Sequence, residues 1–264
     1  MSGENLTFGE HLDELRKMLV RVSCVVALLM LIAFFFKENV FGFLLAPCSH
    51  DFVTYTVLRN FLASIGVNTS LFTEDIELIT TDISSQFMAH LSVSFYSGLL
   101  LSSPYILYEL MKYISPALYD NEKKYANRIL IAVYMLFFLG MVVSYLILFP
   151  VSSRFLSGYN VSPDVQSLIT LDSYLSLFIS LTLMMGVVFE LPVLAVLLAK
   201  IGIVDDGLMA KYRRHAFVLI LVLAAIITPP DILTLVIVSL PLYLLYEVSI
   251  IGVRIICGKK QHKE

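Results

Sequence analysis

The chain has 264 residues, of which 58% are hydrophobic and only 15% are charged, and its mean hydropathy is +0.86. Soluble globular domains carry roughly a quarter of charged residues, so this composition excludes that class and indicates a membrane protein. The net charge of -3 comes with neither a basic groove nor interleaved stacking aromatics, which argues against nucleic acid as a partner.

Six apolar segments follow one another along the chain. They cover residues 22–36, 87–110, 129–149, 174–199, 216–227 and 232–246. We expect each to be a transmembrane helix, because a backbone in lipid must satisfy its own hydrogen bonds and these runs lack the alternation of barrel strands. The predicted fold class is therefore all-α, an integral membrane protein with one transmembrane domain over residues 1–264.

The placement of lysine and arginine predicts the orientation of the spans. If the N-terminus is cytoplasmic, only Lys37, Arg59 and Arg154 of the 18 Lys and Arg residues lie outside. Cytoplasmic loops carry the excess of these residues in membrane proteins, so we expect both termini on the cytoplasmic side.

The segment before the first span is amphipathic. Its apolar positions, at helical spacing, are Phe8, Leu12, Leu15 and Leu19. This pattern predicts a helix along the inner membrane surface, on which Asp13 pairs with Lys17 but Glu14 has no local partner. Glu14 is either a solvated acid of an ordinary amphipathic anchor or a carboxylate available to a cation.

The outside connections differ in length. Residues 37–86 contain amphipathic stretches at 40–45 and 52–65 and predict a helical periplasmic cap, and a second loop covers 150–172. Residues 228–231 read Thr-Pro-Pro-Asp and predict a tight hairpin, in which Asp231 caps the next helix. The two spans that this hairpin joins are short for a bilayer, so they must thin the bilayer locally or pack against a partner.

A second group of acids lies between spans two and three, on the same side as Glu14. Pro116 suits the first turn of a new helix, which places Glu122 near the start of span three. Glu122 is either part of a surface loop neutralised by Lys123 and Lys124 or a ligand. Glu14 and Glu122 together suit two arginines, because a guanidinium binds a carboxylate through two parallel hydrogen bonds and an ammonium does not.

Span four contains a carboxylate far from either end. Glu190 precedes Lys200, which closes the span, by about 15 Å of helix, so it lies near the bilayer midplane. An ion there is unfavourable, so Glu190 must be protonated, paired or in contact with a wet cavity. Pro192 predicts a kink beside it. Alternatively, Glu190 is a protonated acid that a neighbouring span satisfies for stability.

A set of motifs in a fixed order supports a family assignment. They are Phe8 to Arg16 (F-x-x-H-L-x-E-L-R), Ala46-Pro47, Ser103-Pro104 with Tyr108, Pro116-Ala117-Leu118-Tyr119 with Glu122, Phe149-Pro150, Phe189-Glu190-Leu191-Pro192, Thr228-Pro229-Pro230-Asp231 and Glu247. On six spans, this set resembles the TatC family, the multispanning subunit of the twin-arginine protein translocase of the bacterial cytoplasmic (inner) membrane. The chain departs from the family pattern at Tyr113, where phenylalanine is common, and at Leu235, where a polar residue is frequent.

The resemblance implies function and site residues. The family binds twin-arginine signal peptides of folded cargo at the cytoplasmic face, recruits single-span partners of the TatA and TatB type, assembles as homo-oligomers and uses the proton motive force. The matching signal-peptide residues are Glu14, Arg16, Glu122, Tyr113, His11 and Leu15. The matching partner-binding or hydrated membrane site is Glu190, Pro192, Thr228, Asp231 and Thr234. Structural positions are Pro47, Pro104, Pro116, Tyr119, Pro150, Pro229 and Pro230.

Two other classes of function compete with a translocase. A proton-coupled small-molecule transporter would use Glu190 and Glu247 as proton carriers, although no internal repeat is visible. An intramembrane enzyme is disfavoured, because no nucleophile and base occur at a recognisable spacing. Neither a metal-ligand motif nor a nucleotide-binding motif occurs, so no metal or cofactor is expected.

Overall fold

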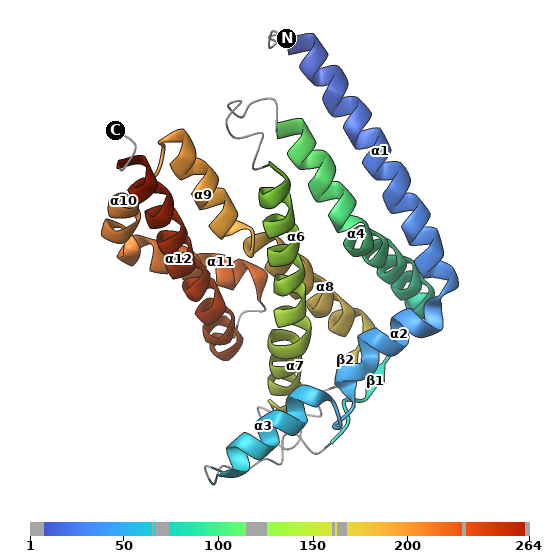
Figure 1. Cartoon of the computed structure of the whole chain (residues 1–264). Coiled ribbons are helices and arrows are strands. Elements are labelled where there is room, and N and C mark those ends of the chain that lie inside the picture. Colours follow the sequence, from blue (N-terminus) through green and yellow to red (C-terminus); the bar gives the residue numbers. More distant parts are fainter. Residues whose placement is uncertain are drawn as a thin grey trace. The chain divides into compact units, whose positions relative to one another are not determined.

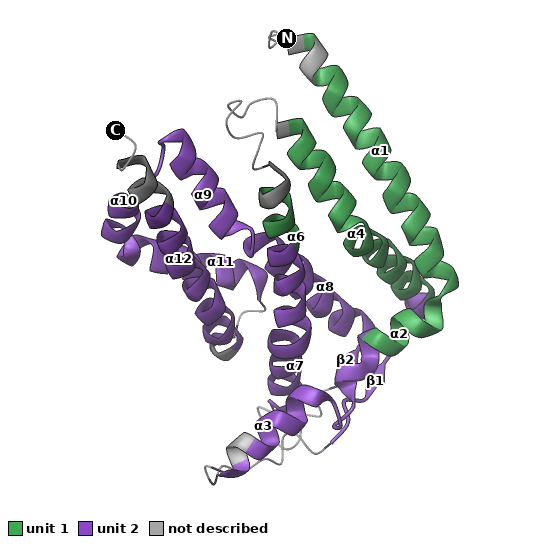
Figure 2. Ribbon diagram, in the orientation of Figure 1, with its two compact units in different colours: residues 1–43, 87–134 green, residues 44–86, 135–264 purple. Residues whose placement is uncertain are grey.

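The computed structural model of the chain describes residues 8–64, 66, 74–114, 126–159, 162, 168–228 and 231–261. These residues form two compact units, coloured separately in Figure 2. Unit 1 comprises residues 1–43 and 87–134, and unit 2 comprises residues 44–86 and 135–264. Helices dominate both, which agrees with the predicted all-α class.

Unit 1 is built on two long helices, α1 (Phe8–Phe35) and α4 (Ser85–Ile114), which lie side by side in Figure 1. Their backbones come close at Gly98, where an added Cβ would lie 2.6 Å from the Met30 nitrogen. Further along, the His90 ring stacks on Phe34 with 4.1 Å between the ring centroids. Glycine is therefore needed at position 98 for the two helices to pack.

Helix α1 corrects one sequence prediction. The amphipathic segment and the first span were expected as a surface helix followed by a transmembrane helix, but residues 8–35 form one continuous helix. The prediction of a separate surface helix is wrong, because no proline or glycine interrupts the chain between the two segments. The predicted Asp13–Lys17 pair is confirmed, at 3.5 Å.

Unit 2 begins with the segment predicted as a helical cap. Helix α2 (Lys37–Leu45) crosses from unit 1 and continues through a short 3-10 turn, η1 (Ala46–Cys48), and α3 (Val53–Ser64) follows. Strand β1 (Leu78–Ile79) pairs in parallel with β2 (Ile169–Thr170), and Leu78 lies opposite Ile169. The two helical stretches predicted in this loop are thus confirmed, and the short sheet joins it to the start of α8.

The third apolar segment is longer than predicted. Helix α6 (Ala126–Val143) passes through a π-helical turn, η4 (Ser144–Leu148), into α7 (Phe149–Gly158). The prediction that a loop starts at Pro150 is wrong, because Pro150 lies in the first turn of α7. The wider π turn accommodates the proline, whose ring and missing N–H would otherwise interrupt an α-helix.

The fourth segment is broken at the position where proline predicts a kink. Helix α8 (Leu171–Val188) ends just before Glu190, and α9 (Leu191–Ile201) starts just after it. Gly140 of α6 packs against this break, since an added Cβ there would lie 2.6 Å from the Met185 carbonyl oxygen and 2.9 Å from Phe189 Cγ.

The last three helices of unit 2 are α10 (Asp206–Lys211), α11 (Arg213–Ile227) and α12 (Ile232–Gln261). Helix α11 has 15 residues, as expected for a short element. The predicted end of the sixth segment at residue 246 is wrong, because α12 has 30 residues and continues past Glu247. Within the helix, the Glu247 carboxylate accepts from Arg213 and from the Tyr243 hydroxyl, at 2.9 and 3.1 Å.

Among the described residues, four helical segments are long and apolar enough to cross a membrane. They are Leu12–Phe35, Ile129–Gly158, Leu171–Ile201 and Thr234–Ile255. Four of the six predicted spans therefore have a counterpart by length and composition, and α4 and α11 occupy the other two positions. In unit 2, α9, α10 and α12 share a core of Ala199, Met209, Ile250 and Val253.

Candidate functional site

The first turns of α1 carry the acid that the sequence singles out. Glu14 is exposed, and no hydrogen bond or ion pair to it is found within the described parts of the chain. Its neighbour Asp13 is occupied by Lys17. Glu14 is thus a carboxyl group without a cation partner in the part of the chain that is described.

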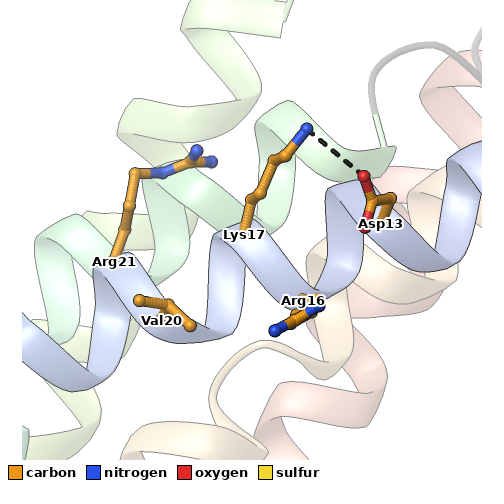
Figure 3. A pocket seen from close by; sticks show the side chains of 5 residues that line it. All are labelled: Asp13, Arg16, Lys17, Val20 and Arg21. Carbon is orange, nitrogen blue, oxygen red and sulfur yellow. Dashed lines mark ion pairs between the residues drawn. The ribbon is translucent and has the colours of Figure 1, made fainter.

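A shallow pocket lies on the same helix (Figure 3). Its lining residues are Asp13, Arg16, Lys17, Val20 and Arg21. Lys17 is paired with Asp13 and Arg21 with Glu109, which leaves the positive charge of Arg16 without an ion pair among the described residues and makes the pocket unfavourable for an arginine ligand. Arg16, which the sequence groups with the signal-peptide residues, therefore suits an acceptor such as a peptide carbonyl or a carboxylate rather than a guanidinium.

The sequence interpretation missed an ion pair between α1 and α4. Arg21 donates from Nη2 to Glu109 Oε2 at 2.6 Å and from Nε to Oε1 at 3.2 Å. The Tyr105 hydroxyl donates to the same Oε1 at 3.0 Å. Glu109 is only 4% exposed. The available signal was the location of Arg21 and Glu109 beside the inner ends of two consecutive apolar segments, together with the helical spacing of Tyr105 and Glu109.

The other predicted signal-peptide residues are only partly placed. Tyr113 lies in the last turn of α4 and is partly buried, and Leu15 is partly buried on α1. The side chain of His11 lies outside the described residues, as do Glu122, Pro116 and Tyr119. The structure therefore places Glu14, Leu15 and Arg16 at one end of α1, and the joint binding of two arginines by Glu14 and Glu122 stays a prediction.

Glu190 lies at the break between α8 and α9. Its backbone N–H donates to the Val187 carbonyl at 3.1 Å, and its own carbonyl accepts from the Leu194 N–H at 3.0 Å. Pro192 is buried in the first turn of α9. The carboxylate oxygen Oε1 is buried without a hydrogen-bond partner within the described residues. The carboxyl group does interact with the backbone of Phe137 on the neighbouring helix α6, so both roles considered from sequence, a structural acid and a site for another group, stay open.

The turn between α11 and α12 holds a second set of unpartnered polar atoms. The Thr234 N–H donates to Asp231 Oδ1 at 2.6 Å, which confirms the predicted cap. Thr228 donates from its hydroxyl to the Ala224 carbonyl at 2.8 Å. Asp231 Oδ2 and Thr234 Oγ1 are buried and have no partner within the described residues. Pro229 and Pro230 lie outside those residues.

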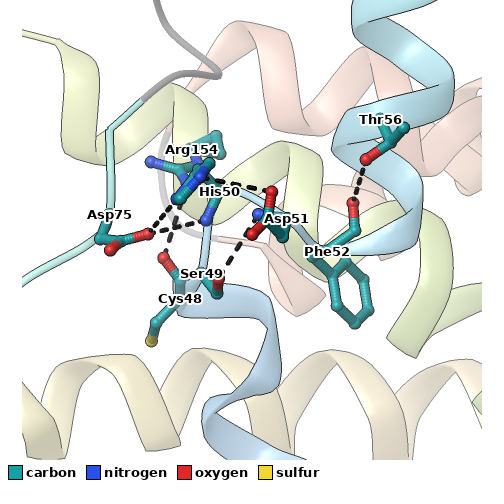
Figure 4. Close-up of polar contacts among 8 residues, drawn as sticks. All are labelled: Cys48, Ser49, His50, Asp51, Phe52, Thr56, Asp75 and Arg154. Atoms are coloured by element: carbon teal, nitrogen blue, oxygen red, sulfur yellow. Dashed lines mark hydrogen bonds and ion pairs between the residues drawn. The ribbon is translucent and has the colours of Figure 1, made fainter.

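The cap segment is fastened by polar contacts (Figure 4). The fully buried Tyr55 donates from its hydroxyl toward the carbonyl oxygens of Pro47 and Pro150, at 2.8 and 3.2 Å, so two of the predicted structural prolines meet at one tyrosine. Arg154 lies over the Tyr55 ring at 4.6 Å. Its guanidinium is directed at the Cys48 carbonyl, 3.5 Å away.

His50 ties the same segment to the chain before β1. Its backbone N–H and its Nδ1 both lie 2.8 Å from Asp75 Oδ1. The hydrogen bond from the His50 backbone, followed by that from its ring, holds the pKa of Asp75 below its usual range. The contact is local to the cap, and no spacing in the sequence predicts it.

The remaining predicted structural proline, Pro104, lies inside α4. Next to it, Ser103 Oγ is buried without a partner within the described residues. Among those residues, no group of three or more histidine, cysteine or acidic side chains is arranged to hold a metal ion.

The long apolar helices define a class, a multispanning helical membrane protein, and among its described residues buried polar atoms without a partner lie at the break in the fourth segment and at the turn before α12. The family model for the "Sec-independent protein translocase protein (TatC)" matches residues 10–241. The chain belongs to this family, and its members are membrane components of a protein translocase and not enzymes.

Relatives and solved structures agree with this assignment. The chain is 35% identical to the Sec-independent protein translocase protein TatC of Blattabacterium, over 93% of this chain and 94% of that one. It is 30% identical to the Escherichia coli K12 protein of the same name, over 96% and 90%. A crystal structure of a twin arginine translocase receptor, TatC, matches with a TM-score of 0.71 and 32% identity, over 92% of this chain and 97% of that one.

Proposed function

We propose that this chain is the receptor subunit that binds twin-arginine signal peptides of folded proteins at the cytoplasmic face of the inner membrane. In this proposal the chain has six spans with both termini in the cytoplasm, and Glu14 and Glu122 each bind one arginine of the peptide. The similar crystal structure is that of a twin arginine translocase receptor, which supports the same role. The transporter alternative is not favoured by these similarities, and Glu247, one of its two proton carriers, is occupied by Arg213.

The observation that carries the proposal is the state of Glu14. It is exposed and has no cation within the described residues, whereas the carboxylates nearest to it in the same element and on α4 are bound by Lys17 and Arg21. A charge-assisted hydrogen bond contributes about 1.5 to 3 kcal/mol. An arginine that fits this carboxylate is thus held about 10-fold to 150-fold more tightly than one that does not.

The test is direct binding in lipid nanodiscs. A peptide with the Arg-Arg motif and its Lys-Lys counterpart are titrated against the wild type and against Glu14→Gln and Glu122→Gln. Each variant is expected to weaken the Arg-Arg peptide by roughly 10-fold or more, and less for Lys-Lys. Asp13→Asn is the matched control, since it removes an adjacent carboxylate that Lys17 already holds. Unchanged affinity in both glutamine variants would refute the receptor role of these residues.

We also propose that the unpartnered polar atoms of unit 2 receive single-span partner helices of the TatA and TatB type. Glu190 Oε1 and Thr234 Oγ1 are buried acceptors that a polar side chain on a partner helix can satisfy. Thr228, Asp231 and Pro192 shape the two places where these atoms lie. Normal export of a folded cargo by Glu190→Ala would instead assign Glu190 a structural role.

A further inference from the structure

The ion pair between Arg21 and Glu109 joins α1 to α4 in unit 1. The guanidinium contacts both carboxylate oxygens, at 2.6 and 3.2 Å, and Tyr105 adds a third donor. The Glu109 side chain is 5% exposed, whereas the Arg21 side chain is 46% exposed. Glu109 therefore accepts three hydrogen bonds from inside the chain, and the Arg21 side chain remains about half accessible.

This pair lies near the end of the contact between α1 and α4. Met30 of α1 lies against Gly98 of α4, and Arg21 lies against Glu109, so the two helices run antiparallel. Glu14 precedes Arg21 by seven residues, which is two turns and about 10 Å, and differs from it by only about 20° around the helix. Met18, between them on this face, is buried.

Seven residues, or about 10 Å, from Glu109 toward the C-terminus of α4 lead past Ile114, the last residue of that helix. Glu14 therefore lies on the face of α1 that packs against α4, but just beyond the end of α4. No described residue of α4 reaches this level, so the location of the Arg21–Glu109 contact determines how far Glu14 lies beyond Ile114. If α1 slid along α4 by one turn, in the direction of the C-terminus of α1, Glu14 would lie alongside the last turn of α4.

We propose that Arg21 and Glu109 are positioning residues of the signal-peptide site. Their ion pair fixes the register of α1 on α4 so that Glu14 stays free past the helix end, and it withdraws Glu109 from competition for an incoming arginine. This inference rests on the proposed receptor function. Glu14 binds the peptide, and the Arg21–Glu109 pair determines the location of the Glu14 carboxylate. Arg21 therefore acts through Glu14 and does not contact the peptide.

Selectivity between arginine and lysine follows from the same arrangement. If Arg21 is removed, Glu109 becomes an unpaired acid in addition to Glu14 and Glu122, and a lysine can pair with a carboxylate without the two-point geometry of arginine. We expect Arg21→Gln to weaken the Arg-Arg peptide about 3-fold to 10-fold while the Lys-Lys peptide weakens less, so that the ratio between the two falls. Arg21→Lys keeps the positive charge but loses the planar guanidinium, so its peptide affinities are expected to lie between those of the wild type and Arg21→Gln.

The test is peptide binding in nanodiscs to four variants whose folded fraction is checked by thermal unfolding. They are Arg21→Gln, Arg21→Lys, Glu109→Gln and the exchange Arg21→Glu with Glu109→Arg. The exchange restores an ion pair at the same register, so it is expected to recover at least half of the lost affinity on a logarithmic scale. Arg254→Gln is the matched control, because it breaks an ion pair with Asp206 in unit 2.

Two results would overturn the inference. One is that the folded single variants keep the wild-type affinity and the wild-type ratio between the peptides, which is what a merely structural pair predicts. The other is that the exchange variant binds no better than the single variants. The receptor proposal fails separately, if Glu14→Gln and Glu122→Gln bind normally while Arg21 and Glu109 are intact.

Discussion

Two carboxylates inside the helical units, Glu109 in unit 1 and Glu190 in unit 2, have opposite surroundings. Glu109 accepts from both donors of Arg21 and from the Tyr105 hydroxyl. Glu190 stands at a helix break, and its Oε1 is buried with no partner in the described parts of the chain. Burial alone therefore does not mark a functional acid in this protein. The Glu109 carboxylate joins α1 to α4, whereas Glu190 keeps one carboxyl oxygen, Oε1, without a partner among the described residues.

Removing each acid in turn tests this contrast most strongly. Glu109→Ala leaves Arg21 unpaired and is expected to lower the free energy of unfolding by about 2 to 3 kcal/mol, less than for a fully buried pair because Arg21 is half exposed. Glu190→Leu removes an unsatisfied polar atom and is expected to be neutral or stabilising by about 1 kcal/mol, yet to impair export of folded cargo.

Chemical denaturation in matched detergent, together with export of a folded reporter, measures both effects. Glu109→Gln serves as the control for volume, because it keeps the side-chain shape and one acceptor. The contrast between the two acids fails if Glu190→Leu unfolds as easily as Glu109→Ala, since Glu190 would then be bound inside the folded chain.

One close helix contact in each unit gives a second test. Gly98→Ala would drive a Cβ into the Met30 backbone, and Gly140→Ala would drive one into the Met185 carbonyl beside the break at Glu190. Each is expected to cost about 1 to 2 kcal/mol of stability through overpacking. Only Gly140→Ala is expected to reduce export further than its stability loss explains, because it displaces the break.

Gly42→Ala is the matched control in thermal unfolding, since a Cβ there meets nothing within 4 Å and alanine favours helix. If Gly98→Ala and Gly140→Ala reduce export equally at equal stability, the position of the break has no special role.

A smaller effect is expected at the pair between Arg213 and Glu247. Both side chains are partly exposed, at 46% and 31%, so Arg213→Gln is expected to cost less than about 1 kcal/mol. The melting temperature at low and high salt measures it, and the difference between wild type and variant should shrink as salt rises. A large, salt-independent loss would instead place this pair in the same class as Glu109.

The smallest expected effect is on the stability of the protein at acidic pH. Because His50 holds the pKa of Asp75 below its usual range, the contribution of Asp75 to stability is fully present above the ordinary carboxyl pKa of about 4 and is lost as the pH falls through the lower folded value. Asp75→Asn is therefore expected to flatten the pH dependence of unfolding below about pH 4. Glu77→Gln, an exposed acid in the same segment, is the control and should follow the wild type.

Local signals in the sequence predicted many elements correctly. The helical stretches of the cap, the Asp13–Lys17 pair, the Asp231 cap and the break next to Pro192 were all predicted, since each depends on residues within about one helical turn of one another. The predicted ends of the third and sixth segments were wrong. Pro150 and Glu247 look like terminators by composition, but a π turn accommodates the first and an ion pair with Arg213 neutralises the second.

Composition, apolar runs and ordered motifs were enough to identify a helical membrane protein of the TatC family, and helical spacing was enough to single out Glu14 and Glu190 as acids without local partners. Three findings depend on the folded structure. Arg21 pairs with Glu109, the Tyr55 hydroxyl bonds to the carbonyl oxygens of both Pro47 and Pro150, and Glu190 Oε1 has no partner among the described residues. Apolar periodicity and capping depend on nearest neighbours along the chain, whereas the partner of a buried charge depends on which distant helix packs against it.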